Sequence, residues 1–317
     1  MKAIICTQFG SPEVLQLREV KKPIPKDNEV LIKIATTAVT ASDCIMRTFQ
    51  FRLWPPKRLL FSVPAGLMLG VSKPRKPIFG LVLSGKIEAV GKGVTKFQPG
   101  DQVFGTTGLR FGSYAEYTCL PENGVLTLKP SNLNDEETVA IPYGGLLASH
   151  FLRKGNMRRG QKILIYGASG AIGTAAVQLA KHFGAEVTGV CSTTNLELVK
   201  SLGADAVIDY TQEDFTQSDI QYDLILDAVG RRKSRARASK ELCQKVLRPN
   251  GLYISVDDGT PKMLLEDLIS LKELAEAGKF KPIIDRCYPL EQMVEAHRYV
   301  DQGHKKGNVV ITVGHDD

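Results

Sequence analysis

The sequence has little of what metal-binding and secreted proteins depend on. Its six cysteines are spread along 317 residues, and no two of them stand in a CxxC pair. A structural zinc site needs clustered thiolates, and disulfide frameworks are rare in chains without an export signal. Residues 1–6 resemble a strand, not a charged segment followed by a long apolar core. We therefore expect no signal peptide and six single, reduced cysteines.

Long apolar runs are also missing. No run approaches the roughly 18–20 apolar residues that a membrane-spanning helix needs. The hydrophobic fraction of 43% and the charged fraction of 24% are ordinary for a globular protein, so we expect a cytoplasmic protein without a membrane span. The formal net charge of +7 suits an anionic ligand such as a phosphorylated cofactor. It equally suits weak contacts with polyanions and does not decide between them.

The chain is long enough for two domains, and its pattern changes once. Residues 1–125 hold short alternating or β-branched runs separated by glycine and proline, which predicts a small, partly open barrel. The predicted strands are 3–7, 14–20, 30–35, 86–90 and 114–120.

Residues 126–285 alternate predicted strands with helices, which indicates an α/β fold with a doubly wound parallel sheet. The strands are 162–166, 186–191, 206–210, 224–228 and 252–256, and the helices are 171–183 and 196–202. A last strand over 308–313 follows a helix over 290–302, and we expect 286–317 to return to the first domain.

Two segments fit neither pattern. Residues 47–76 combine large apolar side chains with the interrupting prolines Pro55, Pro56 and Pro64. This favours an irregular flap packed on the barrel, with a cover over an apolar ligand pocket or a membrane-surface patch as alternatives. Residues 231–237 contain five basic side chains and resemble a nucleic-acid-binding tract. We favour a solvated helix start near a cofactor, so nucleic acid is not the expected partner.

The most informative motif is the turn from Gly167 to Gly173, which follows a predicted strand and opens a helix. Such a strand–turn–helix is typical of dinucleotide-binding sites. Gly167 permits a tight turn, Gly170 lets a pyrophosphate approach the backbone, and Gly173 allows close helix packing. The N–H groups of Ala171 and Ile172 would face the anion at the positive helix end. Ser169 lies within the same turn.

The end of the second strand bears on the choice of cofactor. NAD-specific sites usually place an Asp or Glu there, against the ribose 2′-hydroxyl. This chain has Ser192, Thr193 and Asn195 instead, and Tyr210 ends the third strand, within expected reach of a 2′-phosphate. The loop contains no arginine. We therefore expect NADP(H) as the cofactor and keep NAD(H) as the alternative.

Several further motifs together resemble the medium-chain dehydrogenase/reductase superfamily, nearest its zinc-free quinone oxidoreductases. They are Ser42-Asp43, Gly80 with Gly85, Pro99 to Gly105, Gly112 to Tyr117, Gly167 to Gly173, Leu202 to Asp205, and Asp227 to Gly230. The resemblance implies a GroES-like barrel domain, a Rossmann domain, and an active site in the cleft between them. It also implies a homodimer.

Departures from the family pattern are equally informative. Zinc-dependent members carry a cysteine where this chain has Thr40, and a histidine where it has Leu81. Neither residue can bind zinc as a thiolate or an imidazole, so we expect no catalytic zinc. Tyrosines that the family places near the substrate are replaced by Ile45, Phe49 and Phe51, and a threonine near the nicotinamide by Leu147.

The resemblance also supplies further site residues. Asp43 matches the family position, and with Thr40 and Arg47 it forms the substrate-side candidate set. Each has a plainer interpretation, since Asp43 would serve as a helix cap and Arg47 as a surface residue. The remaining cofactor candidates, by their matching positions, are Val229, Gly230, Ser255, Val256 and Asn308.

These features favour an NADPH-dependent reductase of quinones or α,β-unsaturated carbonyl compounds. Hydride transfer to a small electrophilic acceptor needs no metal if the site positions the acceptor against the nicotinamide. One alternative is a cofactor-binding module with little turnover that acts as a redox-responsive partner. Another is a zinc-free alcohol dehydrogenase-like enzyme, although alcohol oxidation would need zinc or a strong base to remove the proton.

Overall fold

The computed structural model describes residues 1–48, 70, 73–230 and 239–315. The chain divides into two compact units. The barrel unit comprises Met1–Lys129, Leu133–Val139 and Ile284–Asp317. The parallel-sheet unit comprises Pro130–Asn132 and Ala140–Ile283.

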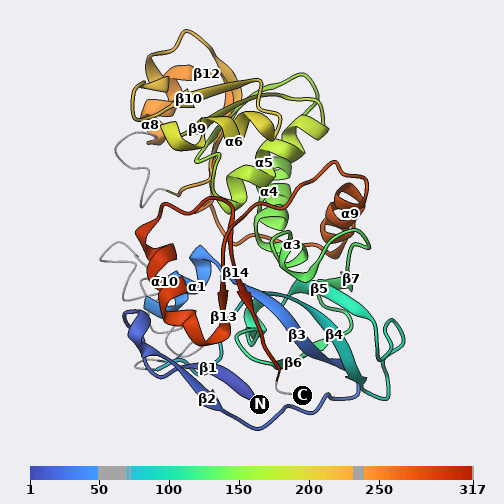
Figure 1. The fold of residues 1–317 in the computed structure, drawn as a ribbon. Coiled ribbons are helices and arrows are strands. Elements are labelled where there is room, and N and C mark those ends of the chain that lie inside the picture. Colours follow the sequence, from blue (N-terminus) through green and yellow to red (C-terminus); the bar gives the residue numbers. More distant parts are fainter. Residues whose placement is uncertain (49–69, 71–72, 231–238, 316–317) are drawn as a thin grey trace. The chain divides into compact units, whose positions relative to one another are not determined.

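A seven-stranded sheet forms the barrel unit, in the order β13-β14-β3-β4-β5-β7 with β6 also paired to β3 (Figure 1). Its strands are β3 (Glu29–Val39), β4 (Val82–Val90), β5 (Gln102–Thr106), β6 (Tyr117–Pro121), β7 (Leu126–Leu128), β13 (Ile284–Pro289) and β14 (Asn308–Thr312). The long β3 is buried along most of its length because neighbours cover both of its edges. The last strand, β14, pairs antiparallel with β3.

Short elements complete the barrel unit. The strands β1 (Lys2–Cys6) and β2 (Leu15–Glu19) pair antiparallel in a separate two-stranded sheet. The helices are α1 (Ala41–Thr48), α3 (Asp135–Val139) and α10 (Met293–Gln302). Helices α1 and α10 contact each other, although they come from opposite ends of the chain (Figure 1). The apolar core joins strands and α10 through side chains such as Ile32, Leu83 and Met293.

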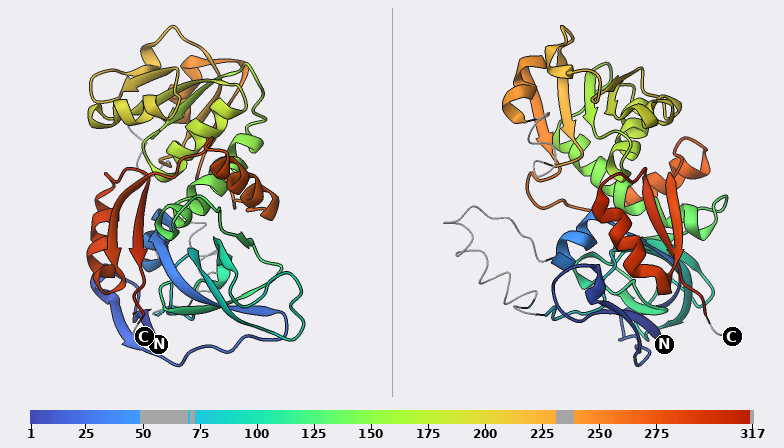
Figure 2. Two further views of the ribbon diagram at one scale, coloured as in Figure 1. Left: turned by 45° about the vertical axis from the view of Figure 1, so that its right-hand side comes forward. Right: turned by 60° about the vertical axis from the view of Figure 1, so that its left-hand side comes forward.

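Five parallel strands build the second unit, in the order β10-β9-β8-β11-β12. They are β8 (Lys162–Tyr166), β9 (Glu186–Cys191), β10 (Ala206–Asp209), β11 (Tyr222–Asp227) and β12 (Leu247–Ser255). The helices are α4 (Pro142–Lys154), α5 (Ala171–His182), α6 (Leu196–Ser201), α8 (Lys240–Cys243) and α9 (Leu265–Glu276). Helices α5 and α6 pack on the sheet (Figure 2). The predicted fold class, a parallel α/β sheet plus a GroES-like barrel, is confirmed.

Single 3₁₀ turns connect many of these elements. They are η1 (Pro12–Val14), η2 (Gly108–Arg110), η3 (Thr193–Asn195), η4 (Phe215–Gln217), η5 (Gln244–Val246) and η6 (Leu290–Gln292). The turn η3 occupies the position where we predicted cofactor-binding residues after the second strand.

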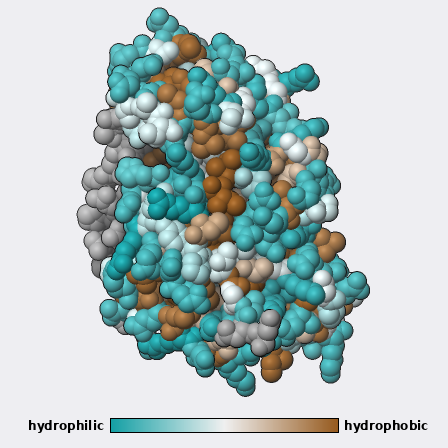
Figure 3. Space-filling view, viewed as in Figure 1, coloured by the Kyte–Doolittle hydropathy of each residue, from teal (hydrophilic) through white to brown (hydrophobic). Residues whose placement is uncertain are grey.

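Two of the expectations from sequence fall mostly or wholly outside the described residues. Of the predicted flap at 47–76, only the ends and Gly70 are described, and the basic tract 231–237 is not described at all. In the described ranges, no helix is both long and apolar enough to cross a membrane. The face in Figure 3 is mostly hydrophilic, with smaller apolar patches between the polar groups.

Candidate functional site

The glycine turn joins β8 to α5 in a conformation that suits only glycine at its first position. Gly167 has a φ of +80°, and a Cβ there would lie 2.4 Å from Cγ2 of Val229. The N–H groups of Gly167 and Ala168 both donate to the carbonyl of Val190, at 3.0 Å. The turn is thereby tied to the end of the neighbouring strand β9.

Gly173 and Gly170 differ in how much space surrounds them. A Cβ on Gly173 would stand 2.1 Å from the carbonyl oxygen of Gly167 and 2.7 Å from Cα of Ala168. The first turn of α5 therefore has to pass directly against the backbone of the glycine turn. Among the described residues, a Cβ on Gly170 would meet only the Gly167 oxygen, at 3.6 Å. The backbone at Gly170 is thus open to a ligand, and its φ of −78° is ordinary for any residue.

Helix α5 begins at this open position. Gly170 is its N-cap and provides no side-chain cap, while its carbonyl accepts the N–H of Thr174 at 2.9 Å. The N–H groups in the first turn of a helix have no acceptor within the helix, and the helix dipole makes this end positive. Ala171, Ile172 and Gly173 occupy that turn. An anionic group placed above Gly170 would meet these donors without a side chain in the way.

Asn195 connects the glycine turn to the loop after β9. Its Nδ2 donates to the hydroxyl of Ser169 at 3.2 Å and to that of Ser192 at 3.1 Å. The residue is only 7% exposed, and its Oδ1 has no hydrogen-bond partner. Since serine hydroxyls both donate and accept, the amide can present either its oxygen or its NH₂ group to a ligand. An unsatisfied buried polar atom beside an open backbone cradle fits a bound dinucleotide.

An acidic residue from another strand, Asp209, lies beside the loop after β9. Asp209 ends β10 opposite Cys191 of β9, so the carboxyl ends of the two strands lie side by side. Its Oδ2 accepts the hydroxyl of Thr193, and its Oδ1 accepts the N–H and hydroxyl of Thr211 at 2.9 and 2.7 Å. These hydrogen bonds, with that of Thr193 the strongest, lower the pKa of Asp209. No acid directly follows the second strand in the sequence, but Asp209 from the third strand lies beside this loop.

Tyr210 follows Asp209 directly. Its N–H donates to the carbonyl of Cys191 at 3.1 Å, and its ring lies 6.2 Å from that of Tyr166 between centroids. It is therefore fixed beside the end of β9, the strand that leads into the predicted cofactor loop.

A second acid, Asp227, organises the ends of β11 and β12. Its Oδ1 accepts the N–H groups of Val229 and Gly230, both at 3.1 Å. Its Oδ2 accepts the hydroxyls of Tyr253 at 3.0 Å and Ser255 at 3.3 Å. Asp227 is fully buried, and four donors satisfy its charge. Val256 also donates to the carbonyl of Asp227, at 3.0 Å, so Asp227 fixes four of the predicted cofactor residues.

In the barrel unit, Thr40 and Asp43 form a helix cap. Asp43 Oδ2 accepts the N–H and the hydroxyl of Thr40 at 3.0 and 2.6 Å, which starts α1. Both residues are buried. Burial raises the pKa of Asp43 to about 6, against the opposing effect of the Thr40 hydrogen bonds. The plainer interpretation of Asp43 as a helix cap is confirmed.

Arg47 is fully buried, so its alternative interpretation as a surface residue is wrong. Its guanidinium donates to Nδ1 of His297 at 3.3 Å, to the carbonyl of Gly10 at 2.5 Å, and to the carboxylate of Asp301. Burial, together with the nearby Arg47 charge, lowers the pKa of His297 to about 3, so this imidazole stays neutral. These contacts fix α1 against α10. Asn308, the last predicted cofactor residue, begins β14 in the same unit and is 5% exposed.

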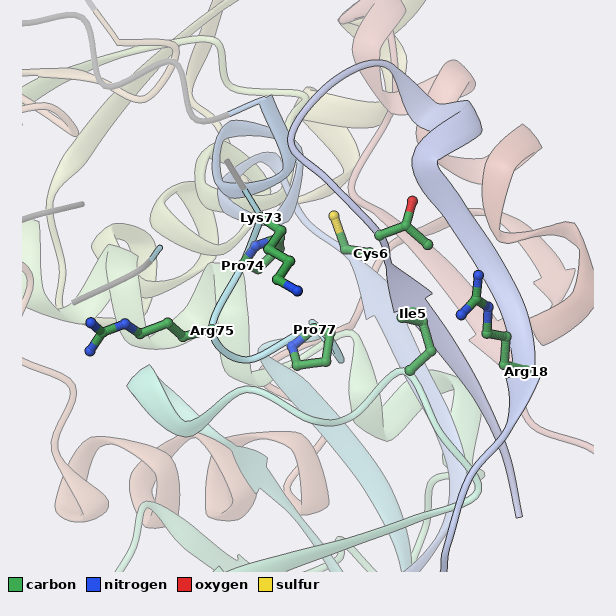
Figure 4. Close-up of a pocket in the computed structure, with 8 residues that line it drawn as sticks. Ile5, Cys6, Arg18, Lys73, Pro74, Arg75 and Pro77 are labelled. Atoms are coloured by element: carbon green, nitrogen blue, oxygen red, sulfur yellow. The ribbon is translucent and has the colours of Figure 1, made fainter. Parts of the chain in front are cut away.

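A surface pocket also lies in the barrel unit, beside β1 and β2 (Figure 4). Its volume is about 660 Å³, and the basic residues in its lining are Arg18, Lys73 and Arg75. The Lys73 ammonium and the Arg18 guanidinium stand on opposite sides of it (Figure 4). None of Thr40, Asp43 and Arg47 lines this pocket, so it is separate from the predicted substrate-side residues.

The described residues offer no group of three or more His, Cys, Asp or Glu side chains arranged to hold a metal ion. The donor set at the family's zinc position, with Thr40 and Leu81, does not fit zinc either. All six cysteines are free, and burial raises the pKa of Cys6 and of Cys191 to about 11. These two thiols stay neutral and are poor nucleophiles at physiological pH.

Comparison with known proteins agrees with this architecture. Residues 26–130 match the model of the alcohol dehydrogenase GroES-like domain, and residues 171–278 and 258–311 match two models of zinc-binding dehydrogenases. The chain is 34% identical to 2-methylene-furan-3-one reductase of Solanum lycopersicum over 98% of its own length and 79% of the relative. The chain belongs to the medium-chain dehydrogenase/reductase family. Its matches place it in the quinone oxidoreductase-like branch, and it is an oxidoreductase.

Other relatives support the same branch. A chloroplastic NADPH-dependent alkenal/one oxidoreductase of Arabidopsis thaliana is 30% identical, with 98% of this chain and 79% of that protein covered. The quinone oxidoreductase of Coxiella burnetii superimposes with a TM-score of 0.82 at 27% identity, covering 99% of each chain. The family resemblance inferred from the motifs is thus confirmed.

Proposed function

We propose that this protein is an NADPH-dependent reductase of quinones or α,β-unsaturated carbonyl compounds. The observation that carries the proposal is the open backbone at Gly170, at the positive start of α5, with the unsatisfied Oδ1 of Asn195 close by. Two of its relatives are named as a furanone reductase and an NADPH-dependent alkenal/one oxidoreductase, and this supports the substrate class.

The residues divide the binding of the cofactor among them. Gly170 to Gly173 provide backbone donors for the pyrophosphate, and Ser169, Ser192 and Asn195 face the adenosine side. Thr193 and Tyr210 flank the ribose 2′ position, while Val229, Gly230, Ser255 and Val256 form the strand ends toward the nicotinamide. Asn308 belongs to the proposed set through its matching family position.

A bound reduced nicotinamide supplies a hydride to the electron-poor carbon of the acceptor, and a proton from water completes the reduced product. This chemistry requires the chain to position the acceptor and to exclude competing water, and it requires no metal. Thr40, Asp43 and Arg47 stay in the proposal as residues that shape the substrate side. The Thr40 hydroxyl, Oδ2 of Asp43 and the Arg47 guanidinium already bond within the barrel unit, so we assign these three residues no proton transfer.

The experiment that tests the function has two parts. Titration with NADPH and NADH measures binding of each, and NADPH oxidation is then followed with a panel of ortho-quinones and enones. We expect tighter binding of NADPH and oxidation by at least one acceptor class. Tight NADPH binding without oxidation by any acceptor would leave the second candidate, a cofactor-binding module with little turnover. Failure of both cofactors to bind would overturn the proposal.

Further properties belong to the same proposal. We expect a cytoplasmic homodimer that uses a small electrophilic acceptor and does not use nucleic acid as a partner. A fluorescent fusion and size-exclusion chromatography with light scattering test location and assembly. Relatives named chloroplastic show that members of this family occupy other compartments, so location needs this direct measurement.

A further inference from the structure

The side chains around Asp209 form a compact acceptor cluster at the predicted 2′ position. The hydroxyl of Thr193 and that of Thr211 each give their single proton to the Asp209 carboxylate. The two hydroxyl oxygens lie 3.1 Å apart. A threonine hydroxyl has only one proton, so both can only accept further hydrogen bonds, and the Thr211 oxygen already accepts one from Nε2 of Gln212 at 3.4 Å.

The two nicotinamide cofactors differ at this position in the group that they present. The 2′-hydroxyl of NADH can donate a hydrogen bond, whereas the ionised 2′-phosphate of NADPH carries only acceptor oxygens and negative charge. An acceptor cluster with an ionised carboxylate therefore favours the hydroxyl and opposes the phosphate. Asp209 comes from the third strand, so the usual inspection of the second strand end overlooks it.

We infer that Asp209, acting through the hydroxyls of Thr193 and Thr211, is a positioning residue that restrains the preference for NADPH and lets the site accept NADH as well. The inference rests on the proposed function, since it requires a nicotinamide dinucleotide at this turn. Asp209 itself is 6% exposed, and its oxygens are already occupied by donors, so it acts mainly by orienting the threonine protons.

Two variants should change selectivity in opposite directions. In Asp209→Asn, the amide oxygen can keep the contacts with Thr211 while the NH₂ group faces Thr193. Thr193 then accepts from the amide and can turn its proton to the ligand, so the ratio of the NADH to the NADPH dissociation constant should rise about fivefold. In Thr193→Val, the Asp209 carboxylate loses the hydroxyl donor of residue 193 and presents a less satisfied anion to the ligand. The same ratio should then fall.

The chain contains a matched control for the aspartate. Asp214 Oδ1 accepts the N–H and hydroxyl of Thr216 at 3.0 and 2.7 Å, the same arrangement that Asp209 makes with Thr211. Asp214 caps the turn η4 (Phe215–Gln217), which is a different turn from the loop after β9. Asp214→Asn removes an equivalent charge while its amide oxygen can keep the contacts with Thr216, so it should leave the ratio unchanged.

The measurement is calorimetric titration of the full chain and its three variants with NADPH and with NADH, with thermal unfolding checked for each. Opposite shifts of the ratio in the two variants, with Asp214→Asn at the wild-type value, support the inference. A general loss of stability would weaken the binding of both cofactors alike and would not shift the ratio of their dissociation constants in opposite directions. An unchanged ratio in Asp209→Asn, or an equal shift in Asp214→Asn, overturns it. If the wild type binds neither cofactor, the proposed function falls and this inference falls with it.

Discussion

Two alanine substitutions in the glycine turn should have different effects. We expect Gly170→Ala to impair ligand binding and Gly173→Ala to impair folding. Both substitutions add a single methyl group. Alanine tolerates the backbone angles of Gly170 and the helical position of Gly173. At Gly173 the new Cβ would lie 2.1 Å from one backbone atom and 2.7 Å from another, so the turn or the helix has to move. At Gly170 the nearest atom lies 3.6 Å away, which is ordinary contact.

The expected magnitudes follow from these distances. Overpacking against fixed backbone costs on the order of 3 kcal/mol, so Gly173→Ala should lower the melting temperature of the parallel-sheet unit by roughly 6–12 °C. Gly170→Ala should leave that temperature within about 1 °C, because its methyl group clashes with none of the residues that the structure describes. If the pyrophosphate lies over Gly170, the same methyl group occupies its place and should weaken NADPH binding at least about tenfold.

Differential scanning fluorimetry and NADPH titration, applied to both variants, provide the two measurements. Unchanged NADPH affinity in a fully stable Gly170→Ala protein would refute the assignment of this position to the pyrophosphate. A Gly173→Ala protein as stable as the wild type would refute the packing argument.

Three further predictions concern buried charge. Asp227→Ala leaves four donors without an acceptor and should cost about 3 kcal/mol in urea unfolding, whereas Glu197→Ala, at a side chain that is 92% exposed, should cost less than about 0.5 kcal/mol. Asp301→Asn leaves the buried Arg47 guanidinium without its carboxylate, so we expect the free energy of unfolding to fall by about 3 kcal/mol. Equal stability of the wild type and the variant would disprove this expectation. Asp43 has a folded pKa of about 6 against an ordinary 3.8, so it stabilises the fold when protonated and that contribution is lost as the pH rises through 6. Asp43→Asn cannot titrate, so the stability of wild type relative to this variant should fall by about 2–3 kcal/mol from about pH 4 to about pH 7, and a difference independent of pH would contradict the assignment.

The sequence predicts the parallel sheet well because its signals are local. The strands predicted over 162–166 and 186–191 match β8 and β9 residue for residue. Each is a short run of side chains that are mostly buried in the sheet, bounded by turn residues, and the pattern needs no knowledge of distant contacts.

Helix α4 shows where local signals fail. Gly144 and Gly145 stand in its first turn, and glycine in a helix costs about 1 kcal/mol relative to alanine, so no helix is predicted there. A Cβ on Gly144 would lie 2.2 Å from the carbonyl oxygen of Ala171, and one on Gly145 would lie 2.6 Å from Cδ1 of Leu271. The glycines thus permit close packing against two other elements, a reason that lies outside the segment itself.

Arg47 shows the same limit for a single side chain. Its partners Gly10, His297 and Asp301 come from segments up to 254 residues away in the sequence. A lone arginine near a helix end has the appearance of a surface residue, and only the packing of α1 on α10 makes it a buried one.

The acids near the glycine turn show that distant contacts also limit what the sequence can predict about function. The rule that an acid at the second strand end selects NAD considers one residue in chain order. Here the register of β9 and β10 brings in Asp209 from the next strand, and the register of β11 and β12 brings Ser255 to Asp227. Both carboxylates are occupied by protein donors, so their effect on a ligand passes through the protons that they hold in place. If Asp209 acts as we infer, cofactor choice at such a turn depends on how the nearby acids are hydrogen-bonded, as well as on which residues follow the second strand.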